Sequence, residues 1–277
     1  MSGLAVVLAG ISALSWGASD FAGGLASKTV PVTKVVFWSQ SVGLVIVSVA
    51  APLVGGDFAL ADLGWGATAG GLGAVGLLAL YRGLAVGRMS VVAPLSAVAG
   101  ALVPVAVGIG LGERPSPVAL AGVAVGIPAL WLIVGGDEVS GPGPSGVAEG
   151  LVAGVGFGLF FVFISRSGAA SGLWPLVGAR AMSITVVAFL AFVAGDAAPP
   201  RSSRAVVAAA GVGDMAANIA FLFASRLGLL SLTAAVSSLY PAATVALARF
   251  VLAERLRRRQ VFGLVAALAA VALIAAG

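Results

Sequence analysis

The sequence predicts an all-α integral membrane protein with ten transmembrane helices, arranged as two inverted repeats of five helices each. Three observations lead to this fold class. Of the 277 residues, 60% are hydrophobic and only 9% are charged, whereas a soluble globular protein carries roughly 25% charged residues. The apolar residues form ten separate runs, each close to the roughly 20 residues that a helix needs to cross a bilayer. The second half of the chain also repeats the pattern of the first half.

The ten apolar runs follow one another with connections too short to hold a soluble domain. Turn and breaker residues separate them, as in Val54-Gly55-Gly56-Asp57 and Arg114-Pro115-Ser116-Pro117. The longest connection, Gly135 to Ser145, falls at the midpoint of the chain. The predicted helices cover, in order, residues 3–25, 33–54, 63–82, 90–111, 117–135, 146–165, 173–194, 204–225, 231–252 and 260–276.

A shift of 141 residues places the first half of the chain on the second half. It aligns Glu113-Arg114 with Glu254-Arg255 and Trp16-Gly17 with Phe157-Gly158. Each repeat contains five predicted helices, an odd number, so the two copies must enter the membrane in opposite directions. This is an architecture of many secondary transporters, whose binding site lies near the midplane between the halves. We therefore expect one repeat over residues 1–138 and a second over residues 146–277.

The positively charged residues predict how the chain is oriented. Positively charged loops stay in the cytoplasm, and the odd-numbered connections carry eleven Lys and Arg residues against four at the even-numbered ones. The eleven are Lys28, Lys34, Arg82, Arg88, Arg201, Arg204, Arg249, Arg255, Arg257, Arg258 and Arg259, and the four are Arg114, Arg166, Arg180 and Arg226. We expect a multi-pass protein of a bacterial-type cytoplasmic membrane, with both termini outside.

Composition also excludes several function classes. The chain has no Cys and no His, which removes disulfides, zinc sites and thiol chemistry, and leaves proton transfer to carboxylates. We expect no cofactor, because the segment from Gly24 to Thr29 lacks the glycines of a phosphate-binding loop. The net charge of +5 is interpreted as contact with the lipid surface and not with nucleic acid. The apolar N-terminus lacks a basic region and a cleavage site, and is therefore predicted to be the first span.

Two kinds of recurring residue are interpreted as structural. Glu113-Arg114 and Glu254-Arg255 recur in both halves, but they stand at helix ends, where they would cap the helix and set the turn. Glycines 17, 23 and 24 in the first span, and glycines 150, 154 and 158 in the sixth, predict close helix crossings, because small residues let backbones approach each other.

Several short motifs stand at corresponding places in the two halves. They are Ser15-Trp16-Gly17-Ala18-Ser19-Asp20-Phe21 with Lys28, Gly87-Arg88-Met89-Ser90, Gly112-Glu113-Arg114, and the second-half segments 231–241 and 253–256. In order and spacing they resemble the EamA-type carriers of the drug/metabolite transporter superfamily over nearly the whole chain. The resemblance implies ten helices in two inverted repeats, a central cavity, and movement of small metabolites such as amino acids. Many such relatives carry an Arg in the second span, where this chain has Trp38-Ser39-Gln40-Ser41, so its charge balance is expected to differ.

Asp214 is the first candidate for substrate binding. A charge at membrane depth costs roughly 2.5–3.5 kcal/mol on insertion scales and therefore points to a function. Asn218 follows four residues later, on the same face of a helix. Together the two side chains can hold an ammonium group, a hydroxyl group or a proton. The alternative is a hydrogen bond between helices that only fixes packing.

Three further candidates carry alternatives of equal or greater weight. Asp20 stands four residues after Trp16, so a cation can lie between the carboxylate and the ring. Equally, Trp16 can lie at the interface while Asp20 pairs with Lys28 or Lys34. Arg180 can neutralise a substrate carboxylate, although a reach towards lipid headgroups is slightly favoured.

Prolines interrupt two corresponding spans, and such breaks point to a binding site in transporters with internal repeats. Tyr240-Pro241 interrupts the ninth span, and Pro94 and Pro104 interrupt the fourth. Ser96, Ser237, Ser238 and Tyr240 are then expected to line the cavity. Kinks that serve packing alone are the alternative.

We expect a secondary carrier that exports or exchanges a small polar metabolite by alternating access. Its partners would be that substrate, the lipid bilayer, and protons or an exchanged metabolite. Uptake and efflux of cationic drugs are alternatives, the latter weakened by an aromatic content of 7%. A membrane enzyme with Asp20 and Asp214 as an acid and base pair would lack His, a metal cluster and a catalytic loop. A purely structural subunit would not need Asp214 within the membrane.

Overall fold

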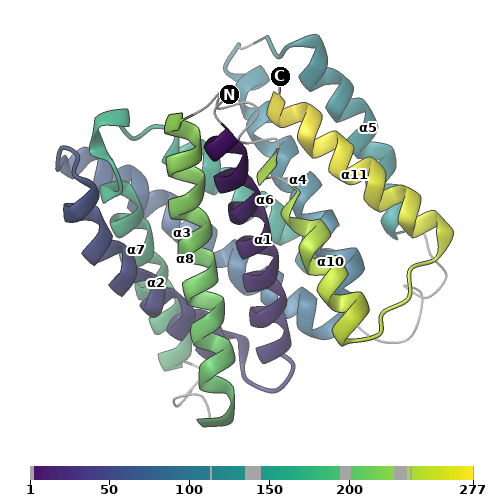
Figure 1. Ribbon diagram of the computed structural model, residues 1–277, viewed down its shortest axis with the longest axis horizontal. Coiled ribbons are helices and arrows are strands. Elements are labelled where there is room, and N and C mark those ends of the chain that lie inside the picture. Colours follow the sequence, from purple (N-terminus) through teal and green to yellow (C-terminus); the bar gives the residue numbers. More distant parts are fainter. Residues whose placement is uncertain are drawn as a thin grey trace.

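The protein is a bundle of α-helices in the computed structural model, which describes residues 3–112, 114–134, 145–193, 201–227, 236–237 and 239–276. Within these residues all regular elements are helical (Figure 1). The ten α-helices are α1 (Gly3–Ala26), α2 (Val32–Val54), α3 (Leu60–Val86), α4 (Met89–Gly110), α5 (Pro117–Val134), α6 (Val147–Ile164), α7 (Trp174–Val193), α8 (Arg204–Leu227), α10 (Tyr240–Val251) and α11 (Arg258–Ala276). Two short 3-10 turns, η2 (Ala169–Ser171) and η3 (Arg201–Ser203), precede α7 and α8.

Among the described residues, eight helices are long and apolar enough to cross a membrane, and many of their large apolar side chains, such as Leu53, Phe192 and Phe262, lie exposed on the outer surface. The apolar part of α5 is shorter, covering Pro117–Ile133, and α10 has 12 residues. The predicted continuous helix over 231–252 differs from the structure, since α10 begins only at Tyr240. Pro241 stands in the first turn of α10, where a proline ring fits and its missing N–H is not needed. Glu113, most of the midpoint connection, and residues 231–235 and 238 of the predicted ninth helix lie outside the described residues.

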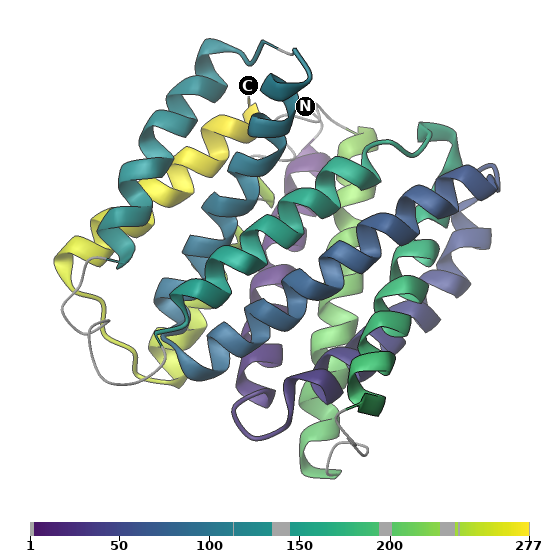
Figure 2. The ribbon, with the colours of Figure 1, turned by 180° about the vertical axis from the view of Figure 1, so that it is seen from behind.

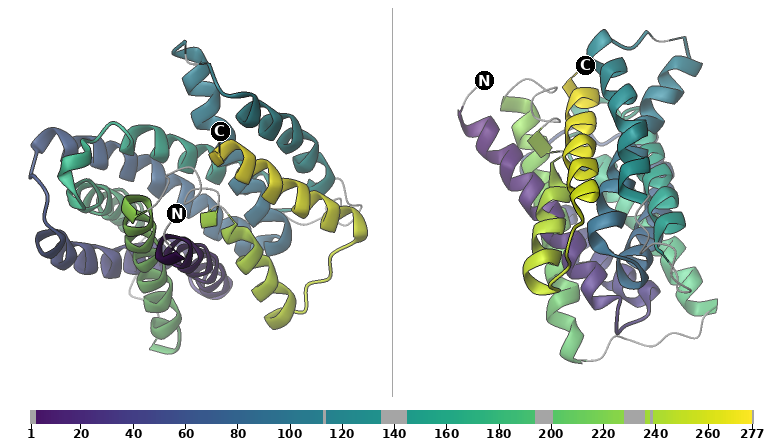
Figure 3. Two further views of the ribbon diagram at one scale, coloured as in Figure 1. Left: turned by 45° about the horizontal axis from the view of Figure 1, so that its top comes forward. Right: turned by 90° about the vertical axis from the view of Figure 1, so that its right-hand side faces the viewer.

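The helix contacts keep nearly the same pattern when the two halves are exchanged. A shift of 141 residues replaces α1 by α6, α3 by α8, and α4 by the segment that contains α10. The contacts of α1 with α8, of α2 with α8, and of α1 with α10 correspond in this way to those of α6 with α3, of α7 with α3, and of α6 with α4. Figure 2 shows α3 and α6 side by side from behind, and α5 and α11 pair at one edge of the bundle in Figure 3.

Close contacts between α5 and α11 also correspond under the 141-residue shift. A Cβ atom at Gly122 in α5 would meet the side chain of Ile274 in α11, at 2.8 Å, and a Cβ at Gly263 in α11 would meet that of Ile133 in α5, at 2.9 Å. Each of these residues is displaced from its counterpart by 141 positions (263 minus 122, and 274 minus 133). The repeat of the sequence is therefore also a repeat of side-chain packing.

The predicted glycine crossings are confirmed. A Cβ at Gly154 would lie 2.4 Å from the Cβ of Ala99, and one at Gly23 would lie 2.0 Å from the ring of Tyr81. Glycines 17, 24, 150 and 158 also face a neighbouring helix, at 2.4–3.0 Å from a Cβ atom built on each. The space between these helices is too small for a methyl group at the glycine positions, so larger residues there would push the helices apart.

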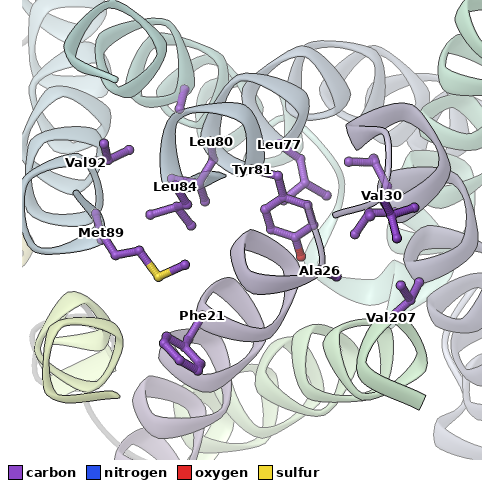
Figure 4. Packing of buried hydrophobic residues seen from close by; sticks show 14 of the residues in the cluster. Phe21, Ala26, Val30, Leu77, Leu80, Tyr81, Leu84, Met89, Val92 and Val207 are labelled. Atoms are coloured by element: carbon purple, nitrogen blue, oxygen red, sulfur yellow. The ribbon is translucent and has the colours of Figure 1, made fainter. Parts of the chain in front are cut away.

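A buried apolar cluster fills one end of the bundle. Tyr81 and Leu84 near the end of α3 pack against Phe21 near the end of α1 and against Met89 and Val92 at the start of α4 (Figure 4). Tyr81, Leu84, Met89 and Val92 have at most 1% of their surface exposed. We call this end the sealed end. The start of α1 and the end of α11 lie at the opposite end (Figures 1 and 3).

Candidate functional site

A cavity of about 690 Å³ lies among the helices of both halves, within the volume range of roughly 300–1,000 Å³ of ligand pockets. It reaches the connection between α4 and α5 at the exposed Arg114, and the last turns of α11 at Ile274 and Ala275. Towards the sealed end its lining stops at Asp20 in α1 and Ser96 in α4. The cavity therefore opens at the end of the bundle where α1 begins and α11 ends.

All eight residues predicted to bind substrate line this one cavity. They come from five of the described helices and from the segment just before α10, and they are Trp16, Asp20, Ser96, Arg180, Asp214, Asn218, Ser237 and Tyr240. Their convergence shows that these polar and aromatic groups face a common space, while their role in binding stays a prediction.

Arg180 of α7 lies inside the bundle and joins three helices. Its Nη1 donates to Oε1 of Gln40 on α2, and its Nη2 donates to Oδ2 of Asp214 on α8. The side chains of Arg180 and Asp214 are only 13% and 21% exposed. The slightly favoured reach of Arg180 towards lipid headgroups is therefore wrong, because the guanidinium compensates the charge of Asp214 inside the bundle.

Beside this ion pair, the amide of Asn218 bonds to its own helix, whereas the Nε of Arg180 has no partner among the described residues. The amide of Asn218 donates to the backbone carbonyl of Asp214 at 2.7 Å and lies 3.5 Å from its Oδ1, so it is partly committed to its own helix. The Nε of Arg180 is buried and has no hydrogen-bond acceptor among the described residues. Gly43 of α2 lies beside that Nε, and a Cβ at this position would be 3.5 Å away.

Asp20 differs from Asp214 because no cation neutralises it among the described residues. Neither Lys28 nor Lys34 pairs with it. The alternative that Asp20 forms an ion pair with one of these lysines is therefore wrong. The ring of Trp16, one turn earlier on α1, faces Phe221 of α8 at 5.9 Å and Tyr240 of α10 at 6.4 Å between centroids. An aromatic wall thus stands next to an unpaired carboxylate.

The hydroxyls of the two predicted serines donate to backbone carbonyl groups. The hydroxyl of Ser96 donates to the carbonyl of Ala93 at 2.9 Å within α4. The hydroxyl of Ser237 donates to the carbonyl of Ala9 at 3.4 Å, which ties the segment before α10 to α1. Both serines are buried, and Ser238 lies outside the described residues.

The prediction missed four aromatic lining residues, which are Phe157, Phe160 and Phe161 of α6 and Phe221 of α8. Gln40 of α2, a weaker candidate in the sequence, also lines the cavity and accepts a hydrogen bond from Arg180. Phe157 could have been found, because the 141-residue shift places it on Trp16. The others carry no such signal, since phenylalanine is expected anywhere in an apolar helix.

Comparison with known proteins identifies one family. The sequence model of the EamA-like transporter family matches residues 3–135 and again residues 144–276. The two matches start 141 residues apart (144 minus 3), the same displacement that superposes the two halves of the chain. No curated protein shows a significant match to the chain.

Proposed function

We propose that this chain, which belongs to the EamA-like transporter family, is a secondary carrier for a small metabolite with an ammonium group and an apolar body, such as an amino acid or a related amine. Family membership and the apolar helices make it a multi-pass membrane protein of a transporter family. The observation that carries the substrate class is Asp20, the unpaired carboxylate beside the aromatic wall of the cavity.

The charges in the inner part of the cavity, away from Arg114 at its mouth, support a cationic group on the substrate. At the depth of the ion pair, Asp20 and Asp214 supply two carboxylates and Arg180 supplies one guanidinium. Because Arg180 neutralises Asp214, one acidic group remains without a countercharge. An uncompensated charge within a membrane is costly, so Asp20 would hold either an ammonium group or a proton.

The remaining lining supports a substrate with an apolar body. Trp16, Phe221 and Tyr240 form the wall nearest to Asp20, and phenylalanines of α6 also line the cavity. Aromatic faces attract cations and pack against apolar groups. A carboxylate on the same substrate would find Arg180, where it can replace Asp214 or Gln40 as an acceptor.

We infer that transport uses two inverted repeats, residues 1–138 and 146–277, with ten membrane crossings. α5 and the segment 231–252 that contains α10 would be the two crossings in addition to the eight long helices. The exchange of helix contacts, and of the Gly122 and Gly263 contacts, under the 141-residue shift supports this symmetry. Alternating access of the repeats around the cavity would then carry substrate across.

Exchange or efflux across a bacterial-type cytoplasmic membrane fits this site, and Asp20 gives a means of coupling. A proton and an ammonium group cannot both occupy one carboxylate, so release of one would accompany binding of the other. Efflux of lipophilic cations is a second candidate. The gathering of six aromatic side chains around the cavity favours it, although the chain as a whole is poor in aromatic residues.

Counterflow into proteoliposomes with three labelled compounds of similar size tests the proposal. Phenylalanine carries an ammonium and a carboxylate group, phenethylamine only the ammonium group, and phenylpropionate only the carboxylate group. We expect exchange of compounds that bear the ammonium group, and a loss of at least about tenfold in Asp20→Asn, because one charge interaction is removed. The matched control is Asp57→Asn, which removes an exposed carboxylate in the connection between α2 and α3.

Each result of this experiment bears on the substrate class. Exchange of phenylpropionate that survives in Asp20→Asn would contradict the proposal. Exchange of phenethylamine without phenylalanine, together with inhibition by a lipophilic cation, would favour the second candidate. An equal loss in Asp57→Asn would show that the effect of Asp20→Asn is not specific to the cavity.

A further inference from the structure

The sealed end of the bundle carries a polar contact between the two halves of the chain. α4 begins there against the connection between α10 and α11, and the carboxylate of Glu254 in that connection receives three hydrogen bonds. The backbone N–H of Met89 donates to Oε1 at 3.0 Å, the N–H of Ser90 donates to Oε2 at 3.1 Å, and the hydroxyl of Ser90 donates to Oε2 at 2.6 Å. We call this group of contacts the Glu254 latch.

In the latch, a carboxylate from the second half of the chain accepts hydrogen bonds from the first backbone N–H groups of α4. The first N–H groups of a helix have no acceptor within the helix, and their partial positive charge favours a carboxylate. Hydrogen bonds to an ionised acceptor are roughly twice as strong as neutral ones. Arg88, the residue before α4, also donates through its guanidinium to the backbone carbonyl of Arg255. The side chain of Arg88, which stands at the N-cap position of α4, makes no capping hydrogen bond to this helix.

A constrained turn holds Glu254 in place. Ala253 has φ 54, the one left-handed conformation among the non-glycine residues that the structure describes. Such a conformation is unfavourable for a residue with a Cβ atom. The N–H of Glu254 also returns to the carbonyl of Ala248 in α10, at 3.3 Å. In the first half, Gly112 occupies the equivalent position (253 minus 141) with φ 88, so both halves use this turn.

The position of the latch relates it to the opening of the cavity. The cavity lining follows one face of α4 through Ala97, Gly100 and Pro104. Ala93 continues this face one turn closer to the sealed end, where it is fully buried in the apolar cluster. Pro94 follows directly, and a proline inside a helix removes a backbone hydrogen bond and permits a bend. The first turn of α4 can therefore move relative to the rest of the helix, once Glu254 releases it.

We propose that Glu254 is a gating residue of the carrier. Its contact with Met89 and Ser90 keeps the sealed end closed while the cavity is open at the other end, and the latch must break before substrate can leave at the sealed end. This inference rests on the proposed function, because only a carrier that works by alternating access needs both ends to open in turn.

The absence of cysteine from the sequence makes the proposal testable with single-cysteine reporters. Ala93→Cys reports on the sealed end, and Ala275→Cys, near the end of α11, reports on the cavity mouth. Purified protein in nanodiscs is labelled with a polar maleimide, so that both faces are accessible. We expect Glu254→Gln to raise the labelling rate at Ala93→Cys by about tenfold, because charged hydrogen bonds to the start of α4 are lost. Labelling at Ala275→Cys should fall or stay the same.

Two further variants separate gating from a general loss of packing. Glu149→Gln makes the same chemical change in the ion pair that Glu149 forms with Arg82, at 3.3 Å, between α3 and α6. It should leave both labelling rates unchanged. Ser90→Ala removes one of the three donors and should raise labelling at Ala93→Cys by a smaller factor. The thermal unfolding temperature of every variant shows whether it has folded.

The outcomes distinguish a failure of the latch from a failure of the proposed function. If Glu254→Gln is folded and labels at Ala93→Cys like the parent protein, Glu254 does not gate the sealed end, whatever the protein transports. An equal increase in Glu149→Gln would also overturn the proposal. If labelling rises as expected but none of the three compounds exchanges in counterflow, the latch stands and the proposed substrate class fails.

Discussion

Arg180 and Asp214 form an ion pair inside the bundle and neutralise each other's charge. This pairing limits what each of them can bind. Asp214 contributes one carboxylate oxygen to Arg180, so it is not a free acid at membrane depth. Asp20 has no such partner among the described residues. The two acids of one cavity therefore have different surroundings, since Asp214 is paired with Arg180 and Asp20 has no countercharge among the described residues. We propose that Asp214 positions Arg180 and that Asp20 is available to a cation.

The ion pair leads to a prediction about stability. Asp214→Asn should lower the free energy of unfolding by about 3 kcal/mol or less, because removal of one partner leaves Arg180 as an uncompensated charge, and water in the cavity reduces the effect. Arg180→Gln should have a similar effect. The double variant should recover much of the loss, since neither charge is then left alone. The free energy of unfolding in SDS is measured for the parent protein, the two single variants and the double variant. Additive losses in the double variant would show that the pair is not coupled.

At the scale of helices, the glycines determine how closely α6 can approach its neighbours. Gly154 meets Ala99 of α4, and Gly156 meets Gly76 of α3 with 2.7 Å between a built Cβ and the facing Cα. α6 thus crosses both helices at contact distance. Membrane helices lack a hydrophobic drive to associate and depend on such close packing.

This packing predicts that Gly154→Val destabilises the fold. The added side chain would overlap Ala99 and the carbonyl of Ser96, which lies 2.7 Å from a built Cβ. Overpacking of this kind costs about 1–3 kcal/mol. Gly10→Ala in α1 is the matched control, because nothing lies within 4 Å of its added Cβ. Both can be followed by the thermal unfolding temperature. Equal stability of the two variants would mean that α6 can shift without cost.

The helices and their crossings could be predicted from the sequence, because they depend on local properties. Apolar length defined the eight long helices, and the glycines of α1 and α6 identified the packed faces. The break before Tyr240 was harder to place, since Tyr240-Pro241 is compatible both with a kink inside a span and with the start of a helix. The structure has the latter.

The interactions within the cavity could be predicted only in part. The cost of a buried charge identifies Asp20, Arg180 and Asp214 as functional candidates, and all three line the cavity. Which acid pairs with Arg180 depends on how α2, α7 and α8 pack, and no local pattern encodes this. The latch was missed for the same reason. Glu254 was correctly placed at a helix corner, but its partner Ser90 is 164 residues away.

At the scale of the whole molecule, the cavity and the basic residues together predict which way the protein faces. The cavity opens at the end that carries the start of α1, the end of α11 and, at Arg114, the fourth connection, between α4 and α5. Most Lys and Arg residues lie at the odd-numbered connections, including those beside the latch. By the positive-inside rule the sealed end would face the cytoplasm. The structure would then be the outward-open state of the carrier.

Single cysteines in the connections test this orientation and the inverted repeat in one experiment. In intact cells, an impermeant maleimide should label Asp57→Cys and Ser165→Cys, which are exposed in the second and sixth connections. It should not label Thr29→Cys or Ser202→Cys, exposed in the first and seventh connections, until the membrane is permeabilised. Each pair contains one position from each half of the chain. The repeats run in opposite directions only if the two positions of a pair lie on the same side of the membrane. The reverse pattern would keep the repeat but place the cavity mouth in the cytoplasm. Disagreement between Asp57→Cys and Ser165→Cys would contradict the inverted arrangement itself.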